Sequence, residues 1–289
     1  MSFLKTLDSN DSIKLYKYRG EDLLTKNDIS GFEKKDFINV CFVDLETTGL
    51  DYNSDVIIEI GIKTISFNKN NFKEFYVSRA YESYNDTDKP LDPEVVQLTG
   101  ITKDMICDKK IDWSIVEEIF DFSDVAVAHN AEFDRYFLSK NIDFNVSWSC
   151  SKADVDWKKR GFLNTKLELL SIWHGFFYES HRAMNDVNAT IHLLAHPSYD
   201  RYPPIEELVE QSSKSHYQII NKFPYNPKLV NVIKKRRKYK YNPSDKTWRG
   251  LFRSKASIDL ELEWLKKNIY NGYFTGDIVE ISPENKYKL

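Results

Sequence analysis

Alternating apolar and polar positions predict strands in the first half of the chain. Residues 37–46, FINVCFVDLE, are rich in β-branched and aromatic side chains, and a Thr-Thr-Gly turn follows them. Residues 55–67 and 72–79 have the same character, and the Asn-Lys-Asn-Asn stretch between them suits a hairpin loop. A further short, buried strand is expected at 124–130. Together these segments predict the strands of one sheet.

Helical periodicity of the apolar positions follows the last of these strands. Residues 131–140 come directly after it, and residues 165–176 and 184–196 are amphipathic, the latter being stopped by a proline. Shorter helices are expected within 92–106 and 112–120. Strands that come first and then alternate with helices predict an α/β domain, in which a mixed sheet carries helices on its faces.

Composition along the chain predicts four segments. Residues 1–36 are polar and mixed, and we expect them to form an N-terminal extension with some helix. Residues 37–197 contain the strands and helices described above and form the main domain. Prolines and a Ser-rich stretch predict a linker over residues 198–226, and residues 227–289 predict a small basic α+β module.

The overall composition indicates a folded protein. The chain has 289 residues, of which 41% are hydrophobic and 14% aromatic, enough for a packed core. No apolar run has transmembrane length, and the first residues lack the pattern of a signal peptide, so we expect no membrane partner. The three cysteines form no CxxC pair, which is typical of buried thiols in a reducing compartment. We therefore expect a cytoplasmic protein.

Charge is distributed unevenly along the chain. The net charge is −3, yet residues 211–289 hold 17 Lys+Arg against 7 Asp+Glu, a balance of +10. The other residues hold 24 basic and 37 acidic side chains, a balance of −13. This asymmetry favours metal-binding or catalytic carboxylates in the front part and a polyanion contact in the tail, although many basic runs are only solvated faces.

Asp44 and Glu46 are the first candidates for chemistry, because they lie two residues apart at the end of a predicted strand. The period of two places both side chains on the same face. Two like charges side by side are unfavourable unless a cation lies between them, and a divalent metal is the natural solution. The alternative is a solvated strand end, but the preceding Val40, Phe42 and Val43 indicate burial.

Two further aspartates lie near predicted helix starts. Asn130 can cap the helix that follows it, which puts Asp134 in the first turn, where the helix dipole favours a carboxylate. Asp186 has a similar position, and either residue could be only a partner of the dipole. His181 precedes Asp186 by five residues, a poor spacing for one helix face, so we expect its side chain to project from a loop.

The order of these residues along the chain resembles that of a known family. VDLETTGL (43–50), HNAEFD (129–134) and HRAMND (181–186) are similar to the three motifs of the DnaQ-like DEDDh exonucleases, which include the proofreading subunit of the bacterial replicative polymerase. IIEIGI (57–62) and LDPEVVQLTGIT (91–102) extend the resemblance to most of the main domain.

The resemblance implies a ribonuclease-H-like α/β fold with a mixed five-stranded sheet, and a 3′→5′ exonuclease that releases nucleoside 5′-monophosphates. It implies that two Mg²⁺ or Mn²⁺ ions are held by Asp44, Glu46, Asp134 and Asp186, since hard cations prefer oxygen ligands and a metal pair can clamp an in-line displacement. His181 would be the general base that takes a proton from the attacking water.

The same resemblance assigns a substrate pocket. The turn Thr47-Thr48-Gly49-Leu50 would receive the terminal nucleotide, with backbone amides on the 3′-hydroxyl and Leu50 against the last base, and an ordinary turn is the alternative. Glu59 either reaches the 3′-hydroxyl or is a buried, paired carboxylate. His129 and Asn130 are candidates for the pocket or for a structural role. Residues 146–154, VSWSCSKAD, lack the Asp-Thr pair frequent in the family, so the course of 146–160 stays open.

The basic tail predicts a helix, a hairpin and a second helix. Its hairpin, 239–252, turns at Asn-Pro-Ser-Asp, and the helix at 257–270 places Leu260, Trp264 and Leu265 on one side. The unit resembles a small C-terminal module of some bacterial DnaQ-like exonucleases. Cations interleaved with aromatic rings suit single-stranded nucleic acid, whereas a module core and a solvated basic run are the alternative. The candidate contacts are Lys234, Lys235, Arg236, Arg237, Lys238, Tyr239, Tyr241 and Trp248.

Three functions are therefore weighed. The first is hydrolysis of DNA from a 3′ end, favoured by the closeness of the motifs to the proofreading type, with a DNA polymerase or repair protein as the expected partner. The second is hydrolysis of RNA or short oligoribonucleotides by the same groups, because discrimination of the 2′-hydroxyl depends on details of the pocket. The third is a non-catalytic nucleic-acid-binding module, which all five catalytic side chains argue against.

Overall fold

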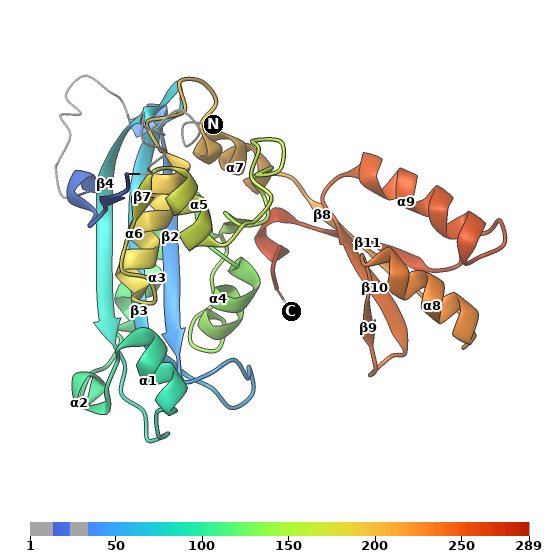
Figure 1. The fold of residues 1–289 in the computed structure, drawn as a ribbon, viewed down its shortest axis with the longest axis horizontal. Coiled ribbons are helices and arrows are strands. Elements are labelled where there is room, and N and C mark those ends of the chain that lie inside the picture. Colours follow the sequence, from blue (N-terminus) through green and yellow to red (C-terminus); the bar gives the residue numbers. More distant parts are fainter. Residues whose placement is uncertain (1–13, 24–33, 289) are drawn as a thin grey trace. The chain divides into compact units, whose positions relative to one another are not determined.

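A computed structural model describes residues 14–23 and 34–288 and divides the chain into two compact units (Figure 1). Unit 1 extends to Ser212 and also includes the chain end from Tyr287, and unit 2 is Ser213–Lys286. Within the described residues, no helix combines the length and the apolar character that crossing a bilayer requires.

Unit 1 is built on a five-stranded sheet in the order β4-β3-β2-β5-β6. The first three strands run antiparallel to one another, and β5 and β6 continue the sheet in parallel with β2. The strands are β2 Phe37–Thr47, β3 Ile57–Asn68, β4 Asn71–Tyr84, β5 Val125–Ala128 and β6 Ser147–Cys150. The predicted α/β fold with a mixed five-stranded sheet is confirmed, and the stretch whose course was open supplies the last strand.

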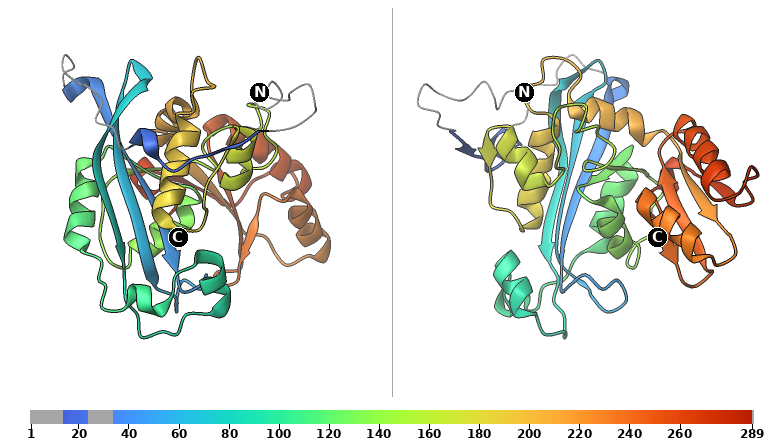
Figure 2. Two further views of the ribbon diagram at one scale, coloured as in Figure 1. Left: turned by 60° about the vertical axis from the view of Figure 1, so that its left-hand side comes forward. Right: turned by 45° about the vertical axis from the view of Figure 1, so that its right-hand side comes forward.

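Side-chain alternation along β2 assigns each of its residues to one of two cores. Val40 and Phe42 pack on the face covered by α5 (Leu167–Trp173), α6 (Ala183–Leu194) and α7 (Pro204–Ser212). Cys41 and Val43 pack on the opposite face, covered by α3 (Trp113–Phe122) and α4 (Ala131–Leu138) (Figure 2). Asp44 and Glu46 continue the even-numbered series, so they point toward the α6 side.

The connection from β4 to α3 holds two short helices, α1 (Pro93–Thr99) and α2 (Lys103–Ile106). The side chain of Asp92 caps α1 by accepting from the backbone N–H of Glu94, and Gly100 ends the helix in the left-handed conformation. Both helices were predicted within 92–106.

The described part of the N-terminal extension belongs to unit 1. Its strand β1, Tyr16–Lys17, pairs in parallel with β7, Phe176–Phe177, and Tyr18 and Leu23 are buried in the α6-side core. Single turns of 3-10 helix follow at Glu21–Leu23 and Lys34–Asp36. The rest of the predicted extension, 1–13 and 24–33, lies outside the described residues.

The prediction of a linker over residues 198–226 is wrong. Most of it is regular structure, namely α7 of unit 1 and β8 (His216–Asn221) of unit 2. In the sequence, unit 2 begins at Ser213, directly after α7. Pro204 is the first residue of α7, a position where proline is tolerated because its missing N–H would have no helical partner anyway. The proline therefore begins a helix there and does not mark an irregular segment.

Unit 2 is an antiparallel sheet in the order β11-β8-β10-β9 with two helices packed on it. The predicted helix, hairpin and helix are present as α8 (Pro227–Arg236), β9 (Lys240–Asn242) with β10 (Thr247–Phe252), and α9 (Lys255–Asn268). The strand β8 and the last strand β11 (Asp277–Ile281) complete the sheet.

The predicted apolar side of α9 is partly wrong. Leu260 is 76% exposed, whereas Ile258, Glu261 and Leu265 are buried. A glutamate thus takes the place of an apolar residue in the core of unit 2.

Candidate active site

Three carboxylates from two elements converge at the end of β2. Single oxygens of Asp44, Glu46 and Asp186 lie within 4.8 Å of one another. Asp44 and Glu46 lie opposite Gly61 and Glu59 of β3, and the register between the strands shifts just after Glu46. Asp44 and Glu46 thus share one face of β2, as the strand period predicted, and on that face they meet Asp186 of α6.

The start of α6 reaches this position because β3 has a glycine there. A Cβ added to Gly61 would lie 2.6 Å from the carbonyl carbon of Ala183 and 2.6 Å from the backbone nitrogen of Met184. The absence of a side chain lets the helix come against the strand directly beside Asp44. Asp186 is then held by the backbone N–H of Arg182 at 3.2 Å and by the hydroxyl of Tyr178 at 2.8 Å.

Asp134 comes from the first turn of α4, which follows β5 directly. Its side chain is buried, and it lies outside the set of three whose oxygens are within 4.8 Å of one another. Its charge nevertheless raises the pKa of Asp44 and of Glu46. Asn130 occupies the cap position, but in the left-handed conformation and without a side-chain capping bond to any described residue, so the expected cap is wrong in this respect.

The four carboxyl groups are buried or half-buried, and the pKa of each is raised. Burial, followed by repulsion from Asp186, raises the pKa of Asp44 well above its usual range and that of Glu46 to about 8. Burial raises the pKa of Asp134 to about 7 and that of Asp186 to about 6. A buried group of like charges and oxygen ligands fits a hard divalent cation such as Mg²⁺ or Mn²⁺.

His181 lies in the loop that precedes α6, in the left-handed conformation with φ +63°. Its side chain is 41% exposed, and its Nε2 lies 3.7 Å from Oε1 of Glu168. The hydroxyl of Ser180 donates to the same carboxylate oxygen at 2.8 Å. The ring therefore projects from a loop, as expected from its spacing, and has an acidic neighbour from α5.

The turn after β2 is held by its own side chains. The hydroxyl of Thr47 donates to the carbonyl of Gly49 at 2.6 Å, and both threonines of the turn are buried. Leu50 is 81% exposed although it follows a buried strand. The turn therefore presents an apolar side chain to solvent on a hydrogen-bonded backbone.

Asp55 organises this turn from the other end of the loop. It accepts from the hydroxyl of Thr48 at 2.7 Å and from the N–H of Asp51 at 2.8 Å, and it pairs with Lys89. A Cβ at Gly49 would lie 2.5 Å from its Oδ2, so no side chain fits at the glycine. These contacts explain why a glycine is needed in the turn.

A family model described as exonuclease matches residues 41–194, more than half of the chain and all the carboxylates above. The chain belongs to the exonuclease family. Members of this family generally use divalent metal ions. The resemblance seen in the three motifs is thereby confirmed for the family, and the region of unit 1 that matches is an exonuclease domain.

Curated relatives of the exonuclease domain are longer proteins. The PolC-type DNA polymerase III of Bacillus subtilis is 32% identical over 166 residues, 52% of this chain and 11% of that protein. The 3′-5′ exonuclease DinG of Staphylococcus haemolyticus is 29% identical over 252 residues, 80% of this chain and 25% of that protein. The chain thus spans a quarter or less of the length of these relatives.

Similar solved structures include Exonuclease X in complex with 5′ overhanging duplex DNA, 20% identical with a TM-score of 0.45. The match covers 59% of this chain and 98% of that one. Exonuclease I of E. coli in complex with a dA16 oligonucleotide is 16% identical with a TM-score of 0.45, and the match covers 63% and 48% of the two chains.

Two of the residues expected to touch substrate, Glu59 and His129, have structural partners in the exonuclease domain. Glu59 is buried, and its oxygens accept from the guanidinium of Arg182 at 2.9 Å and from the N–H of Ala183 at 2.9 Å, so it is the paired carboxylate of the two alternatives. His129 is hydrogen-bonded through both ring nitrogens, to Ser151 at 2.7 Å and to the carbonyl of Thr165 at 2.8 Å. Asn130 is exposed beside it.

Several residues of the site belong to no motif or periodic pattern that would have identified them from the sequence. Tyr178 donates to Asp186 from eight residues away, and Glu168 of α5 faces His181 in the loop before α6. Neither spacing belongs to a strand or helix period, so only the fold brings these pairs together. Gly61 is different, because a glycine within an apolar strand is a local signal of close backbone approach.

The tail residues proposed to contact nucleic acid fall into two groups. Glu261, fully buried, accepts from Arg236 at 2.8 Å, from Lys238 at 2.6 Å and from the hydroxyl of Tyr239 at 3.2 Å. Tyr239 and Trp248 are themselves in the core of unit 2, so the prediction that these two rings stack on bases is wrong, because the small unit needs them for its own packing. The exposed members are Lys234, Lys235, Arg237 and Tyr241, together with the paired Lys238.

Proposed function

We propose that this protein is a DEDDh-type 3′→5′ exonuclease that hydrolyses phosphodiester bonds at the 3′ end of DNA, in particular of single strands. One observation carries the proposal. Asp44, Glu46 and Asp186 meet within 4.8 Å, Asp134 shares their electrostatic field, and His181 stands in the loop that leads to Asp186. The name of one relative, a PolC-type DNA polymerase III, favours DNA over RNA.

The four carboxylates would hold two Mg²⁺ or Mn²⁺ ions. Bound there, such ions would supply positive charge to the phosphoryl oxygens and to the leaving oxygen in the transition state. The chain contributes the geometry that keeps the ligands together. Gly61 admits the helix start, and the hydrogen bonds from Tyr178 and from the N–H of Arg182 fix both oxygens of Asp186.

His181 takes a proton from the water that attacks the phosphorus atom, while the bond from phosphorus to the 3′-oxygen of the penultimate nucleotide breaks. That 3′-oxygen becomes the new terminal hydroxyl, and a nucleoside 5′-monophosphate leaves. Glu168, 3.7 Å from Nε2, stabilises the imidazolium that forms, and Ser180 holds this carboxylate in place. A nearby carboxylate favours the charged form of the histidine, which exists only after the ring has taken the proton.

The turn from Thr47 to Leu50 receives the terminal nucleotide in this proposal. Asp55 accepts a hydrogen bond from the loop backbone and pairs with Lys89, so the backbone amides of the turn are fixed before substrate binds. Leu50, which is 81% exposed, lies against the terminal base. Such a contact is insensitive to the identity of the base, as an exonuclease that degrades any sequence requires.

Hydrolysis of three substrates tests the proposal. Labelled single-stranded DNA, duplex DNA and RNA of one sequence are incubated with Mg²⁺ or Mn²⁺, with Asp44→Asn and EDTA as controls. We expect a ladder from the 3′ end that is fastest on single-stranded DNA and absent from both controls. Faster degradation of RNA would overturn the assignment of substrate. Binding of all three without any hydrolysis would leave only a nucleic-acid-binding module.

We propose in addition that the exposed cations at the end of α8, including its C-cap Arg237, bind the phosphates of the nucleic-acid strand. Lys234, Lys235 and Arg237 form no ion pair within the described part of the chain, and Tyr241 of the same unit is half-exposed. Each phosphate contact adds about 0.7 to the slope of log affinity against log salt for single strands. Replacing the three cations by Ala should flatten the slope by up to about 2. An unchanged slope would leave the docking of a protein as their role.

A further inference from the structure

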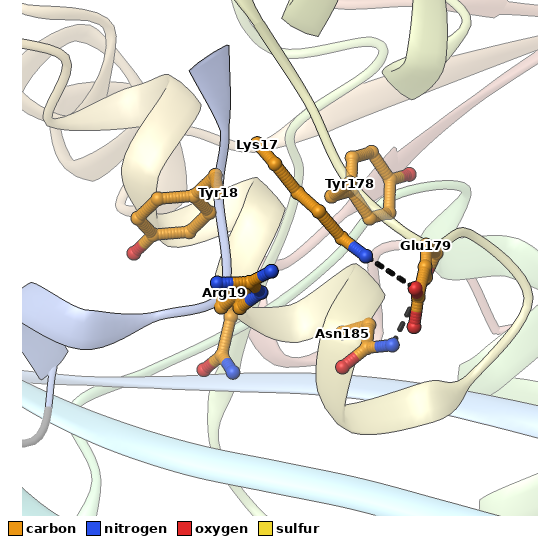
Figure 3. Close-up of a pocket in the computed structure, with 7 residues that line it drawn as sticks. Lys17, Tyr18, Arg19, Tyr178, Glu179 and Asn185 are labelled. Atoms are coloured by element: carbon orange, nitrogen blue, oxygen red, sulfur yellow. Dashed lines mark hydrogen bonds and ion pairs between the residues drawn. The ribbon is translucent and has the colours of Figure 1, made fainter.

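A pocket of about 270 Å³ lies next to the candidate active site, and none of the roles proposed above uses it. Tyr178 connects the two, because it lines the pocket while its hydroxyl donates to Asp186 at 2.8 Å. Asn185, the residue before Asp186, also lines it. The complete lining is Lys17, Tyr18, Arg19, Tyr178, Glu179, Asn185 and Asn188 (Figure 3).

The N-terminal segment supplies one wall of this pocket and is held in place on both sides of Arg19. The N–H of Tyr18 donates to the carbonyl of Phe177 at 2.8 Å, and its ring is stacked on His192 with 3.9 Å between the centroids. On the other side, Gly20 adopts φ +79°, and a Cβ there would lie 2.8 Å from Nδ2 of Asn188. The backbone of Arg19 is thus anchored before any ligand binds.

Donors prevail among the groups that face the pocket. The guanidinium of Arg19 is exposed and forms no hydrogen bond or ion pair in the described parts of the chain, and its charge acts on Glu179 from a distance. Lys17 is paired with Glu179 at 2.5 Å, as Figure 3 shows. Asn188 is buried, and its Oδ1 accepts from Nζ of Lys63 at 2.7 Å. This bond leaves the amide protons of Asn188 on the side of the N-terminal segment.

We propose that this pocket is a phosphate subsite for the substrate strand, in which Arg19 makes the main contact and the Asn188 amide a second. The inference rests on the proposed exonuclease function, because a polynucleotide bound at Asp186 brings further phosphates to the neighbouring surface. A guanidinium on an anchored backbone, an amide held by Lys63 and two cations against one carboxylate suit an anion. A volume of about 270 Å³ is just below the usual range of ligand pockets, about 300–1,000 Å³, and suits one phosphate with part of its sugar.

Arg19→Ala in the full-length protein tests the subsite, with Arg201→Ala as the matched control. Arg201 is an exposed arginine of unit 1 that does not line the pocket. Binding of a fluorescent single-stranded DNA is measured in EDTA over a range of salt concentrations, so that catalysis is not needed. We expect affinity to fall about ten-fold, as for the loss of one charge-assisted hydrogen bond, and the salt slope to fall by about 0.7. The control should change neither quantity.

Glu179→Gln provides a test of opposite sign. It removes the carboxylate that pairs with Lys17, and we expect tighter binding and a steeper salt slope. Hydrolysis of the p-nitrophenyl ester of thymidine 5′-monophosphate, which is too small to reach beyond the carboxylates, should be the same for Arg19→Ala and wild type. A drop on this ester equal to that on the strand would mean that Arg19 acts on Asp186 and would overturn the subsite.

The remaining outcomes separate this inference from the proposed function. A wild type that degrades DNA while Arg19→Ala binds it with unchanged affinity and salt slope would overturn the subsite alone. A wild type that hydrolyses nothing would overturn the proposed function, and the binding measurement would still decide the subsite. Weaker inhibition of Arg19→Ala by thymidine 5′-monophosphate, with unchanged affinity for the strand, would place the released product in the pocket and overturn the strand assignment.

Discussion

Replacing Asp134 by asparagine should stabilise the metal-free protein while it abolishes hydrolysis. The carboxyl group is buried, and burial raises its pKa from 3.8 to about 7. The folded state therefore retains a proton that the unfolded state has lost between pH 4 and pH 7. Stability that is present at low pH is lost as the pH rises through this window. Asparagine resembles the protonated acid and does not suffer this loss.

The size of the effect follows from the two pKa values. A difference between 3.8 and about 7, at 1.36 kcal/mol for each pH unit, corresponds to about 4 kcal/mol at pH 8. At 2–4 °C per kcal/mol for a unit of this size, the variant should unfold roughly 8–16 °C above wild type at pH 8. At pH 4 the folded carboxyl group is protonated and the unfolded one is partly so, and the difference should fall below about 1 kcal/mol.

Thermal unfolding of both proteins in EDTA between pH 4 and pH 8.5 measures this difference. Buried histidines act in the opposite direction, since burial lowers the pKa of His129 and of His174 to about 4, so acid destabilises the folded state. They are present in both proteins and cancel in the comparison. Added Mg²⁺ should stabilise the wild type more than the variant. Parallel curves for the two proteins from pH 4 to pH 8.5 would refute the electrostatic reasoning.

Three further substitutions have distinct expected results. His181→Ala should slow hydrolysis about 10²–10⁴-fold and remove the acidic limb of the pH–rate profile, and an unchanged profile would exclude it as the base. Gly61→Ala should destabilise unit 1 by about 1–3 kcal/mol in chemical unfolding and lower kcat, because its Cβ would lie 2.6 Å from the backbone of Ala183, and full activity would contradict this. Arg236→Ala should destabilise unit 2 by about 2 kcal/mol, because it removes a partner of the buried Glu261, whereas a matched Lys235→Ala should change stability by less than about 0.5 kcal/mol.

Much of unit 1 could be predicted from local patterns. The alternation of Val40, Phe42 and Asp44 predicted both the strand and the shared face of the two acids, because side-chain direction in a strand depends only on position along it. The spacing of His181 likewise predicted a loop side chain. The three motifs added the order in which distant acids are used, which no single pattern contains.

Pairings between distant segments depended on the tertiary structure alone. The two residues of β1 have no strand signal of their own, and they form a strand only because β7, about 160 residues later, offers an edge. Arg19 and Asp186 thereby come to line adjoining sites. In the same way, the prolines near α7 indicated a linker, and only the packing of Ile205 and Leu208 shows a helix.

Glu261 shows the limit of sequence reasoning most clearly. A glutamate within an amphipathic helix is expected on the solvated face, and Leu260 beside it on the buried one. The structure reverses the two, because Arg236, Lys238 and Tyr239 surround the carboxylate and replace its water. The sequence by itself predicted the first strands of the sheet, most of the helices on it and, through the order of the three motifs, the residues of the acidic site. Whether a charge can be buried depends on partners from elsewhere in the fold, and only the tertiary structure decides which partners those are.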